Sequence, residues 1–319
     1  MSQIAEAQRL VRRREFLQRY GLILSFLLLC LVLALLSDRF LTANNIVNIL
    51  RQSTINGIIA VGMTLVILTA GIDLSVGSIL ALSSVITADM LQTGMPVPAA
   101  ILIGLGVGAG CGLINGVTIT RANVPPFVTT LGMMTIARGF ALVYTEGKPI
   151  TGLPEAFRFI GTGSIGPIPT PIVIAAATFI IGYILLTRTS LGQFIYAIGN
   201  NPVAARYAGI SVSLNITFVY VVSGLLSALA GLILIARLDS AQPTAGIAFE
   251  FDAIAAVVVG GTSFAGGQGG LGGTLIGVLI IAVLNNGLNL LNISSFYQPV
   301  VSGVVIALAL LLHRAVGRE

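Results

Sequence analysis

Residues 62–82 read GMTLVILTAGIDLSVGSILAL, an apolar segment that is interrupted near its middle by the stretch TAGIDLSVGS. The interruption contains two glycines, Gly71 and Gly77, which weaken a helix, and one acid, Asp73. A charged residue within an apolar region is costly in lipid, so it commonly faces a cavity, a partner or a helix end. We therefore predict a helix that breaks at Gly71 and Gly77 and restarts near Leu74. The carboxylate of Asp73 would accept the free backbone N–H groups of the restarted helix.

The composition of the whole chain also indicates a membrane protein. Hydrophobic residues make up 56% of the 319 residues and charged residues only 8%, whereas soluble domains carry about 25% charged residues. A helix needs roughly 20 apolar residues to cross the hydrocarbon core. Ten segments are candidates, of which the eighth is too short for a plain crossing: 20–37, 46–70, 74–92, 97–119, 124–144, 169–187, 214–236, 252–266, 271–291 and 296–312. We predict an all-α, polytopic membrane bundle of about ten transmembrane helices, some of them broken or re-entrant.

The distribution of charge predicts the orientation of this bundle. Five arginines precede the first apolar segment, and the loop 188–213 carries basic residues but no acid. Because loops rich in Lys and Arg stay in the cytoplasm, both termini are predicted to be cytoplasmic, and the long loop 145–168 to be external. We predict that the chain consists of a cytoplasmic tail (1–19), one transmembrane domain (20–313), which includes the cytoplasmic loop 188–213, and a second cytoplasmic tail (314–319).

Several functional classes lack the residues that they require. The chain has one histidine, His313, and two cysteines without metal-ligand spacing, so neither a metal site nor Ser-His-Asp catalysis is predicted. Gly267, Gly269 and Gly272 match a dinucleotide fingerprint by letter, but no strand or βαβ unit is predicted around them. No Gly-Lys-Ser/Thr of an ATP-binding loop occurs, and Lys and Arg form no face that suggests nucleic acid. We expect a chain that is not an enzyme and binds no cofactor itself.

Polar side chains within the apolar segments are the candidates for a solute path. Three asparagines share one helix face of the ninth segment, at spacing i, i+4, i+7: Asn285, Asn289 and Asn292. Amides in lipid seek partners, so this face either makes interhelical hydrogen bonds or lines a hydrophilic path. Asp73 and Ser75 have the same two interpretations, a structural cap or a position on the path. An ion pair between Asp73 and Arg138 is a further alternative.

Small residues mark packing and chain reversal. One face of the fourth segment carries a small residue at every fourth position: Ala100, Gly104, Gly108, Gly112 and Gly116. Small residues let two helices approach closely in lipid, so this face is predicted to be an internal packing seam, with a seam between subunits as the alternative. Gly267 and Gly269 follow the short eighth segment and are predicted to break that helix in a re-entrant or cytoplasmic turn.

The internal loop contains a further helix signal, LGQFIYAIGNNPVAARYAGI at residues 191–210. Asn201 is a favourable N-cap, Pro202 suits the first helical position, and Gly209 suits a C-terminal stop. The pattern predicts a helix of about two turns. An isolated helix this short is unstable in water, so it must dock either on its own bundle or on a soluble partner.

These segments together resemble one family, the permeases of bacterial monosaccharide (ribose-type) importers of the ATP-binding-cassette (ABC) class. The resemblance rests on residues 62–82 and 191–210, on ARLDSAQPTAGIAFEFDAIAAVVVGGTSFAGGQG (236–269) and on GTLIGVLIIAVLNNGLNLLNISSFYQ (273–298). It extends from about residue 40 to residue 312; the N-terminal 20 residues carry no match, and the loop 145–168 matches loosely.

The resemblance implies a pore made by two copies of the chain in the lipid of the bacterial inner membrane. A cytoplasmic ABC ATPase, often with two cassettes in one chain, would bind ATP and magnesium, and a periplasmic sugar-binding protein would deliver the solute. The short helix of the internal loop would be the coupling helix that enters the ATPase, which assigns ATPase coupling to Asn201, Pro202, Ala205, Arg206 and Gly209. The expected solute is a monosaccharide, and the closeness of the match favours D-ribose.

An ion-coupled secondary transporter of a small polar solute is the alternative function. It would need sites for a coupling ion, and Asp73 is the strongest carboxylate candidate within the spans. This alternative gives no reason for a capped helix in the internal loop.

Overall fold

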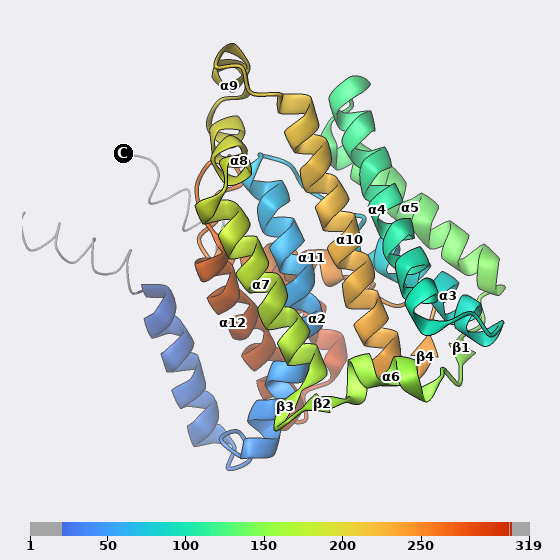
Figure 1. The fold of residues 1–319 in the computed structure, drawn as a ribbon. Coiled ribbons are helices and arrows are strands. Elements are labelled where there is room, and N and C mark those ends of the chain that lie inside the picture. Colours follow the sequence, from blue (N-terminus) through green and yellow to red (C-terminus); the bar gives the residue numbers. More distant parts are fainter. Residues whose placement is uncertain (1–20, 306, 308–319) are drawn as a thin grey trace, which may run out of the picture.

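The computed structural model describes residues 21–305 and 307, and this part of the chain is almost wholly helical (Figure 1). The helices are Gly21–Leu36, α2 (Ala43–Leu68), α3 (Val76–Gln92), α4 (Val97–Arg121), α5 (Pro126–Thr145), α6 (Glu155–Thr162), α7 (Thr170–Arg188), α8 (Ser190–Asn200), α9 (Pro202–Tyr207), α10 (Val212–Leu238), α11 (Phe249–Val259), α12 (Leu271–Leu290) and the 3-10 helix η1 (Ser295–Tyr297), followed by helical residues 298–305. Two antiparallel pairs of two-residue strands complete it: β1 (Ile150–Thr151) with β4 (Ser240–Ala241), and β2 (Ser164–Ile165) with β3 (Ile168–Pro169). The predicted all-α class is confirmed.

The described helices can be compared with the ten membrane spans expected from the sequence. Six described helices are long and apolar enough to cross a membrane, namely α2, α4, α5, α7, α10 and α12. Gly21–Leu36 and α3 are apolar but shorter, and α11 has only 11 residues. The expectation of about ten transmembrane helices is therefore not confirmed. The predicted tails 1–19 and 314–319, with their cytoplasmic location, lie outside the described residues, and the segment 296–312 is described only in part.

Proline defines where three of the long helices begin. Pro96, Pro125 and Pro169 are the N-cap residues of α4, α5 and α7, and each helix also has Pro at its first or second position. Proline lacks the backbone N–H that would be unpaired at a helix start, and its fixed φ suits the first turn. The starts of these helices are therefore local properties of the sequence.

Helices α2 and α10 form the centre of the bundle. In the most apolar 18-residue stretch of each helix, 78% of the residues of α2 and 72% of those of α10 are buried inside the protein. The corresponding share is 28% for α4, α5 and α7. Helix α10 packs against α2, α3 and α4, while α7 and α12 contact α2. In Figure 1, α9 lies at one end of the bundle, and α6 with the four short strands lies at the other.

Helices α4 and α10 pack backbone to backbone along the glycine face predicted for the fourth segment. A Cβ added at Gly108 would overlap the carbonyl oxygen of Gly224, and one added at Gly112 would overlap that of Tyr220. No side chain fits at these contacts, since real Cβ atoms do not approach an oxygen so closely. The face is an internal packing seam, as the sequence predicts, and not a seam between subunits.

The break between α2 and α3 lies where the sequence places it but has a different cause. Helix α2 ends at Leu68, and Ala70 takes the left-handed conformation with φ +60°. Gly71 is needed for space, because an added Cβ would lie 2.5 Å from the Tyr220 hydroxyl. Gly77 lies inside α3, where it makes room for the carbonyl oxygen of Gly246. The two glycines allow close approach, and the chain reversal occurs at Ala70.

The loop 145–168 is more structured than predicted. It contains α6, β1, β2 and the first residue of β3, and Phe157 of α6 is fully buried. Gly161 packs on the backbone at Ala236 and Arg237, where α10 ends. An eight-residue helix gives no signal in a search for membrane spans, which is why sequence reasoning missed it.

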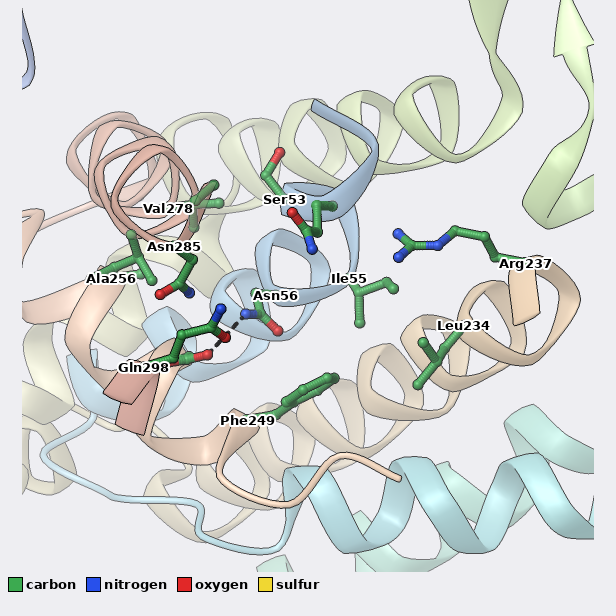
Figure 2. Close-up of a pocket in the computed structure, with 14 residues that line it drawn as sticks. Ser53, Ile55, Asn56, Leu234, Arg237, Phe249, Ala256, Val278, Asn285 and Gln298 are labelled. Atoms are coloured by element: carbon green, nitrogen blue, oxygen red, sulfur yellow. Dashed lines mark hydrogen bonds between the residues drawn. The ribbon is translucent and has the colours of Figure 1, made fainter. Parts of the chain in front are cut away.

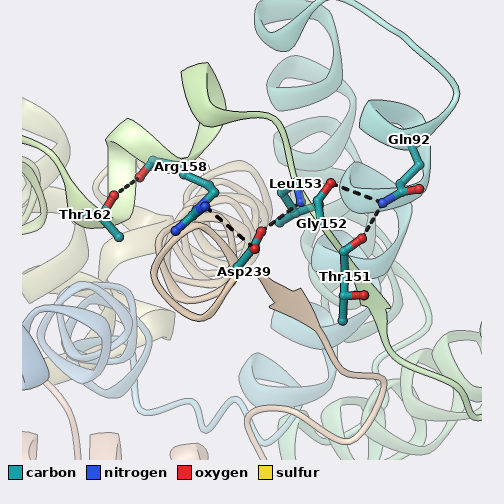
Figure 3. Close-up of polar contacts among 7 residues, drawn as sticks. All are labelled: Gln92, Thr151, Gly152, Leu153, Arg158, Thr162 and Asp239. Carbon is teal, nitrogen blue, oxygen red and sulfur yellow. Dashed lines mark hydrogen bonds and ion pairs between the residues drawn. The ribbon is translucent and has the colours of Figure 1, made fainter.

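Asp239 ties this loop to the end of α10 (Figure 3). Its Oδ1 accepts a hydrogen bond of 2.8 Å from the backbone N–H of Leu153, and its Oδ2 lies 3.8 Å from Nη1 of Arg158. Gln92 at the end of α3 donates to the backbone carbonyls of Thr151 and Gly152. The bundle is thus covered at this end by a folded layer.

Candidate functional site

A polar cavity lies between α2, α10, α11 and α12 (Figure 2). It is near the end of the bundle that carries α6, because Arg237 lines it and lies beside Gly161 of α6. Its volume is about 170 Å³. The polar side chains that line it come from all four helices and the segment after η1: Gln52, Ser53, Asn56, Arg237, Asp252, Asn285 and Gln298. Figure 2 shows Asn56, Asn285 and Gln298 together at one end of the cavity, Arg237 at the other and Phe249 along one side.

Asp252 is the acid of this cavity and is held by two donors. Its Oδ1 accepts a hydrogen bond of 2.7 Å from the hydroxyl of Ser302, and its Oδ2 accepts one of 3.3 Å from Nδ2 of Asn56. Each carboxylate oxygen has about two lone-pair sites. Both oxygens of Asp252 therefore keep a free lone pair for a further donor.

Two amide oxygens in the cavity wall are buried without a hydrogen-bond partner, Oδ1 of Asn56 and Oδ1 of Asn285. A buried acceptor without a partner costs about 1–3 kcal/mol, and such groups are rare in native proteins. An amide oxygen only accepts, so the missing group at each position is a donor. Asn56 and Asn285, which line the cavity, therefore each carry an acceptor that lacks a hydroxyl or N–H partner.

The predicted asparagine face is divided by the structure. Asn285 lines the cavity, Asn289 is exposed and accepts from Gln298 at 3.3 Å, and Asn292 lies beyond the end of α12 with φ +57°. Because α12 ends at Leu290, the spacing that put Asn292 on the same helix face does not apply. Only one of the three candidates therefore contacts the cavity.

Asn286 is the interhelical partner that sequence reasoning missed. Its Nδ2 donates to Oδ1 of Asn45 at 2.9 Å, and Nδ2 of Asn45 donates to Oδ1 of Asn286 at 3.0 Å. The reciprocal pair fastens α12 to the start of α2. Adjacent residues on a helix point about 100° apart, so Asn285 and Asn286 serve different purposes.

Asp73 and Ser75 lie in a separate, fully buried cluster. Oδ1 of Asp73 accepts from the backbone N–H of Ser75 at 3.0 Å and from its hydroxyl at 2.5 Å, and Oδ2 accepts from the Ser223 hydroxyl at 2.8 Å. Nδ2 of Asn115 donates to the Ser75 hydroxyl at 2.9 Å. Helix α3 begins at Val76 with Ser75 as its N-cap residue. The carboxylate holds the turn before α3 from a position two residues ahead of the N-cap, whereas the sequence suggested Asp73 as the cap itself, and neither Asp73 nor Ser75 lines the cavity.

Arg138 does not pair with Asp73. Its Nη1 donates to the backbone carbonyls of Pro243 and Ala245, both at 2.7 Å. These carbonyls belong to the segment that leads from β4 into α11. The ion pair considered from the sequence is thus replaced by a contact that positions the start of α11.

The glycine-rich turn after α11 packs against the end of α2. The backbone N–H of Gly267, with φ +68°, donates to the carbonyl of Leu68 at 2.9 Å. The carbonyl of Gly269, with φ +124°, accepts from the hydroxyl of Tyr196 in α8 at 2.9 Å. Burial raises the pKa of this Tyr196 hydroxyl. Both glycines adopt conformations that favour glycine, and the turn joins α2, α8 and α11.

Helix α9 has the caps that its sequence predicts. Oδ1 of Asn201 accepts from the backbone N–H groups of Val203 and Ala204, both at 3.0 Å, and Pro202 is the first helical residue. At the other end Gly209 has φ +83° and donates its N–H to the Arg206 carbonyl at 3.0 Å. With the bond from the N–H of Ile210 to the carbonyl of Ala205, this forms a Schellman motif.

One side of α9 packs on the protein and the other is exposed. Ala205 is buried in a small cluster with Ile198 and Val212. Arg206 is exposed, and Tyr207 is 90% exposed. The helix is therefore held in place by its caps and one buried alanine, while its tip is free for a partner.

Sequence reasoning missed most of the cavity. Gln52, Ser53 and Asn56 lie in the first half of α2 at spacing i, i+1, i+4, which puts polar groups on one side of an apolar helix. This spacing was a usable signal. Asp252 carries only a weak signal in the sequence, a similarity between its surroundings and those of Asp73.

The fold and the cavity together define a class, a polytopic helical membrane protein with a polar chamber between its central helices, as a solute permease requires. Residues 45–310 match the family described as the permease component of the branched-chain amino acid transport system. The chain belongs to this family of transport-system permease components. It is a multi-pass protein of the inner membrane and not itself an enzyme.

Relatives of this chain are permeases of sugar importers. The chain is 51% identical over 314 residues to the ribose import permease protein RbsC of Bacillus subtilis (strain 168), covering 98% of both chains. It is 47% identical over 303 residues to RbsC of Escherichia coli (strain K12), covering 94% of both. The D-allose transport system permease protein AlsC of the same strain is 40% identical over 308 residues, with 95% of this chain and 94% of AlsC covered. No solved structure matches the chain.

Proposed function

We propose that this chain is the permease subunit of an ABC importer that carries D-ribose across the inner membrane. The observation that carries the proposal is the 51% identity to a ribose import permease over 98% of both chains. The polar cavity between the central helices supports it, because a hydrophilic solute needs polar groups within an otherwise apolar bundle.

The two ends of the bundle fit the two partners of an importer. In the proposed orientation both termini are cytoplasmic, so α9 faces the cytoplasm and the layer made by α6 and the short strands faces outward. The cavity lies near the outward end, where a periplasmic sugar-binding protein would deliver the solute. ATP binding by a cytoplasmic ATPase would move α9, and the bundle would change from outward-open to inward-open.

Helix α9, in the loop 188–213, is the proposed coupling helix. Asn201, Pro202 and Gly209 give it defined ends, and the buried Ala205 attaches it to α8 and α10, so that a push on α9 reaches the spans. The exposed Arg206 is available to an acidic or carbonyl-lined groove of the ATPase. These five residues carry the coupling in this proposal.

The complete importer would contain two copies of this chain. We propose a homodimer in lipid, a cytoplasmic ATPase with two cassettes in one chain, and a periplasmic binding protein. ATP and magnesium bind to the ATPase, and the permease itself holds no cofactor. In each copy, one transmembrane domain, residues 20–313, would contribute to the path.

The test is reconstitution in proteoliposomes of this chain, its ATPase and its binding protein. Uptake of radiolabelled D-ribose is measured with ATP inside, and D-allose and L-leucine serve as competitors. ATP-dependent uptake that D-ribose alone inhibits at low concentration supports the proposal. Uptake by the permease alone under an ion gradient would instead establish a secondary transporter.

A further inference from the structure

We infer that the cavity between α2, α10, α11 and α12 is a binding site for a monosaccharide in transit, with Asp252, Asn56 and Asn285 as acceptors for its hydroxyl groups. This inference deepens the proposed function and rests on it. It assigns solute contact to side chains within one subunit.

The acceptors of the cavity require a ligand with several donors. Oδ1 of Asn56 and Oδ1 of Asn285 have no partner, and both oxygens of Asp252 keep a free lone pair after accepting from Ser302 and Asn56. Water satisfies such groups singly. A polyhydroxylated solute presents several O–H donors on one rigid ring and satisfies them together, without ordering several separate molecules.

The opposite end of the cavity supplies a donor. Nη1 of Arg237 donates to the carbonyl of Arg51 at 3.4 Å, and the guanidinium has five N–H donors in total. Hydroxyl groups accept as well as donate, so a sugar can use both ends of the cavity. A solute with only donors or only acceptors would leave one end unsatisfied.

The size and the walls of the cavity also fit a small ring. Its volume of about 170 Å³ lies below the range of about 300–1,000 Å³ that holds drug-sized ligands. Phe249, Leu234 and Val278 provide apolar contact for the C–H groups of a sugar ring. With one carboxylate and a few amides the site binds weakly, as a path must if the solute is to leave it.

A zwitterionic amino acid is the competing ligand. Asp252 could hold its ammonium group and Arg237 its carboxylate. The sugar is favoured because the unpartnered atoms at Asn56 and Asn285 are neutral amide oxygens, which suit hydroxyl donors, and because Asp252 already accepts two hydrogen bonds from neutral donors. Protection of a cysteine in the cavity wall separates the two ligands.

The test uses protection of a single cysteine in the reconstituted importer. Cys30→Ser and Cys111→Ala remove the two native thiols, and Ser53→Cys places a reporter in the cavity wall without removing an acceptor named above. The control reporter is Asn289→Cys, which lies on exposed α12 surface outside the cavity. The rate of N-ethylmaleimide labelling is measured with increasing D-ribose, L-leucine or betaine.

D-ribose is expected to slow labelling at position 53 about threefold when its concentration reaches twice the dissociation constant, and to leave position 289 unchanged. Adding Asp252→Asn should shift this protection to higher D-ribose concentrations, with gel filtration confirming that the protein is folded. Equal labelling at position 53 without D-ribose and at about 0.1 M D-ribose overturns the inference, because even a weak site with a dissociation constant of about 1 mM would be filled there. Protection by L-leucine and not by D-ribose overturns it as well.

Uptake measured on the same vesicles separates this inference from the proposed function. If ATP-driven D-ribose uptake proceeds but position 53 is never protected, the cavity is not the sugar site and the importer assignment stands. If position 53 is protected but no ATP-driven uptake occurs with the partner proteins, the importer assignment fails and the binding site stands.

Discussion

The hydroxyl of Ser223 in α10 donates a hydrogen bond of 2.8 Å to Oδ2 of Asp73, which joins the break between α2 and α3 to the middle of α10, one of the two central helices. The other carboxylate oxygen accepts twice from Ser75. Asp73 therefore acts here as a structural acceptor for three donors, all buried. Its three contacts make the local stability of the break depend on one side chain.

Replacing Asp73 tests this dependence. Asp73→Ala removes the acceptor for three buried donors and should lower the free energy of unfolding by about 2–3 kcal/mol, since each lost bond in a membrane protein costs about 0.6–1 kcal/mol. Asp73→Asn keeps one carbonyl acceptor and should cost about half as much. Thermal unfolding of the purified permease in detergent measures both. An Asp73→Ala protein as stable as the wild type would remove the structural role.

The seam between α4 and α10 makes a sharper prediction, because two glycines two residues apart on α4 differ only in their surroundings. A Cβ at Gly112 would overlap the backbone carbonyl of Tyr220, whereas a Cβ at Gly110 meets nothing within 4 Å. Gly112→Ala should destabilise the protein by about 1–3 kcal/mol through overpacking. Gly110→Ala should be neutral or stabilise by up to about 1 kcal/mol, because alanine favours a helix. The Gly112→Ala protein should therefore have a lower melting temperature than the Gly110→Ala protein. Equal melting temperatures would contradict close packing at the seam.

The amide pair that joins α2 and α12 calls for a double-mutant cycle. Asn45→Ala leaves the buried amide of Asn286 without its partner, and Asn286→Ala leaves the half-buried amide of Asn45 without one, so each should cost about 1–2 kcal/mol. The double variant should cost less than the sum of the two, with a coupling energy of about 0.5–1.5 kcal/mol. Neither change should alter sugar protection at position 53, because Asn286 does not line the cavity. Additive effects would show that the two amides do not interact.

Arg206 provides the test of the coupling helix. Arg206→Gln removes an exposed charge at the tip of α9 and should leave stability within about 0.5 kcal/mol of the wild type. If α9 engages the ATPase, stimulation of ATP hydrolysis by sugar-loaded binding protein should fall several-fold. Arg188→Gln is the matched control, since Arg188 is an exposed arginine at the end of α7, outside α9. A similar loss in both variants, or in neither, argues against a specific role for α9.

At the end of the bundle that carries α6, substitutions of Asp239 and Arg158 are expected to lower the free energy of unfolding by different amounts. Arg158→Ala breaks a half-exposed ion pair of 3.8 Å, worth about 0–1 kcal/mol. Asp239→Ala also leaves the N–H of Leu153 without its acceptor and puts alanine at φ +53°, so it should cost about 2 kcal/mol. Asp239→Asn keeps an acceptor and tolerates this conformation, and should be nearly neutral. Chemical denaturation ranks the three variants, and a larger effect of Arg158→Ala would reverse the argument.

Features that depend on neighbours along the chain could be predicted from the sequence. The caps of α9 depend on Asn201, Pro202 and Gly209, each within a few residues of the helix end, and the structure has all three as predicted. The starts of α4, α5 and α7 follow from proline in the same way. The break after Leu68 could be placed, although its left-handed residue, Ala70, could not, because the neighbouring Gly71 is the residue type that favours this conformation.

The functional site could not be predicted, because its geometry depends on which helices lie beside one another. Asn285 and Asn286 are adjacent in an apolar helix. The neighbouring sequence does not indicate that Asn285 lines a cavity whereas Asn286 pairs with an amide on α2. Asp73 and Asp252 both follow glycine-containing stretches, yet one is surrounded by hydroxyl donors from α10 and its own turn and the other borders an open chamber.

The sequence by itself determined that the protein is a helical membrane permease and where several of its helices begin and end, since apolar length, charge in loops and caps are properties of short segments. The tertiary structure decided which polar groups are left without partners. Hydrogen bonds between residues about 150 to 240 positions apart, such as those of Ser223 with Asp73 and of Asn286 with Asn45, satisfy some polar side chains. Among the side chains that remain unsatisfied, Asn56 and Asn285 line the cavity. Burial in the bundle makes the difference matter, because a polar group buried without a partner costs free energy.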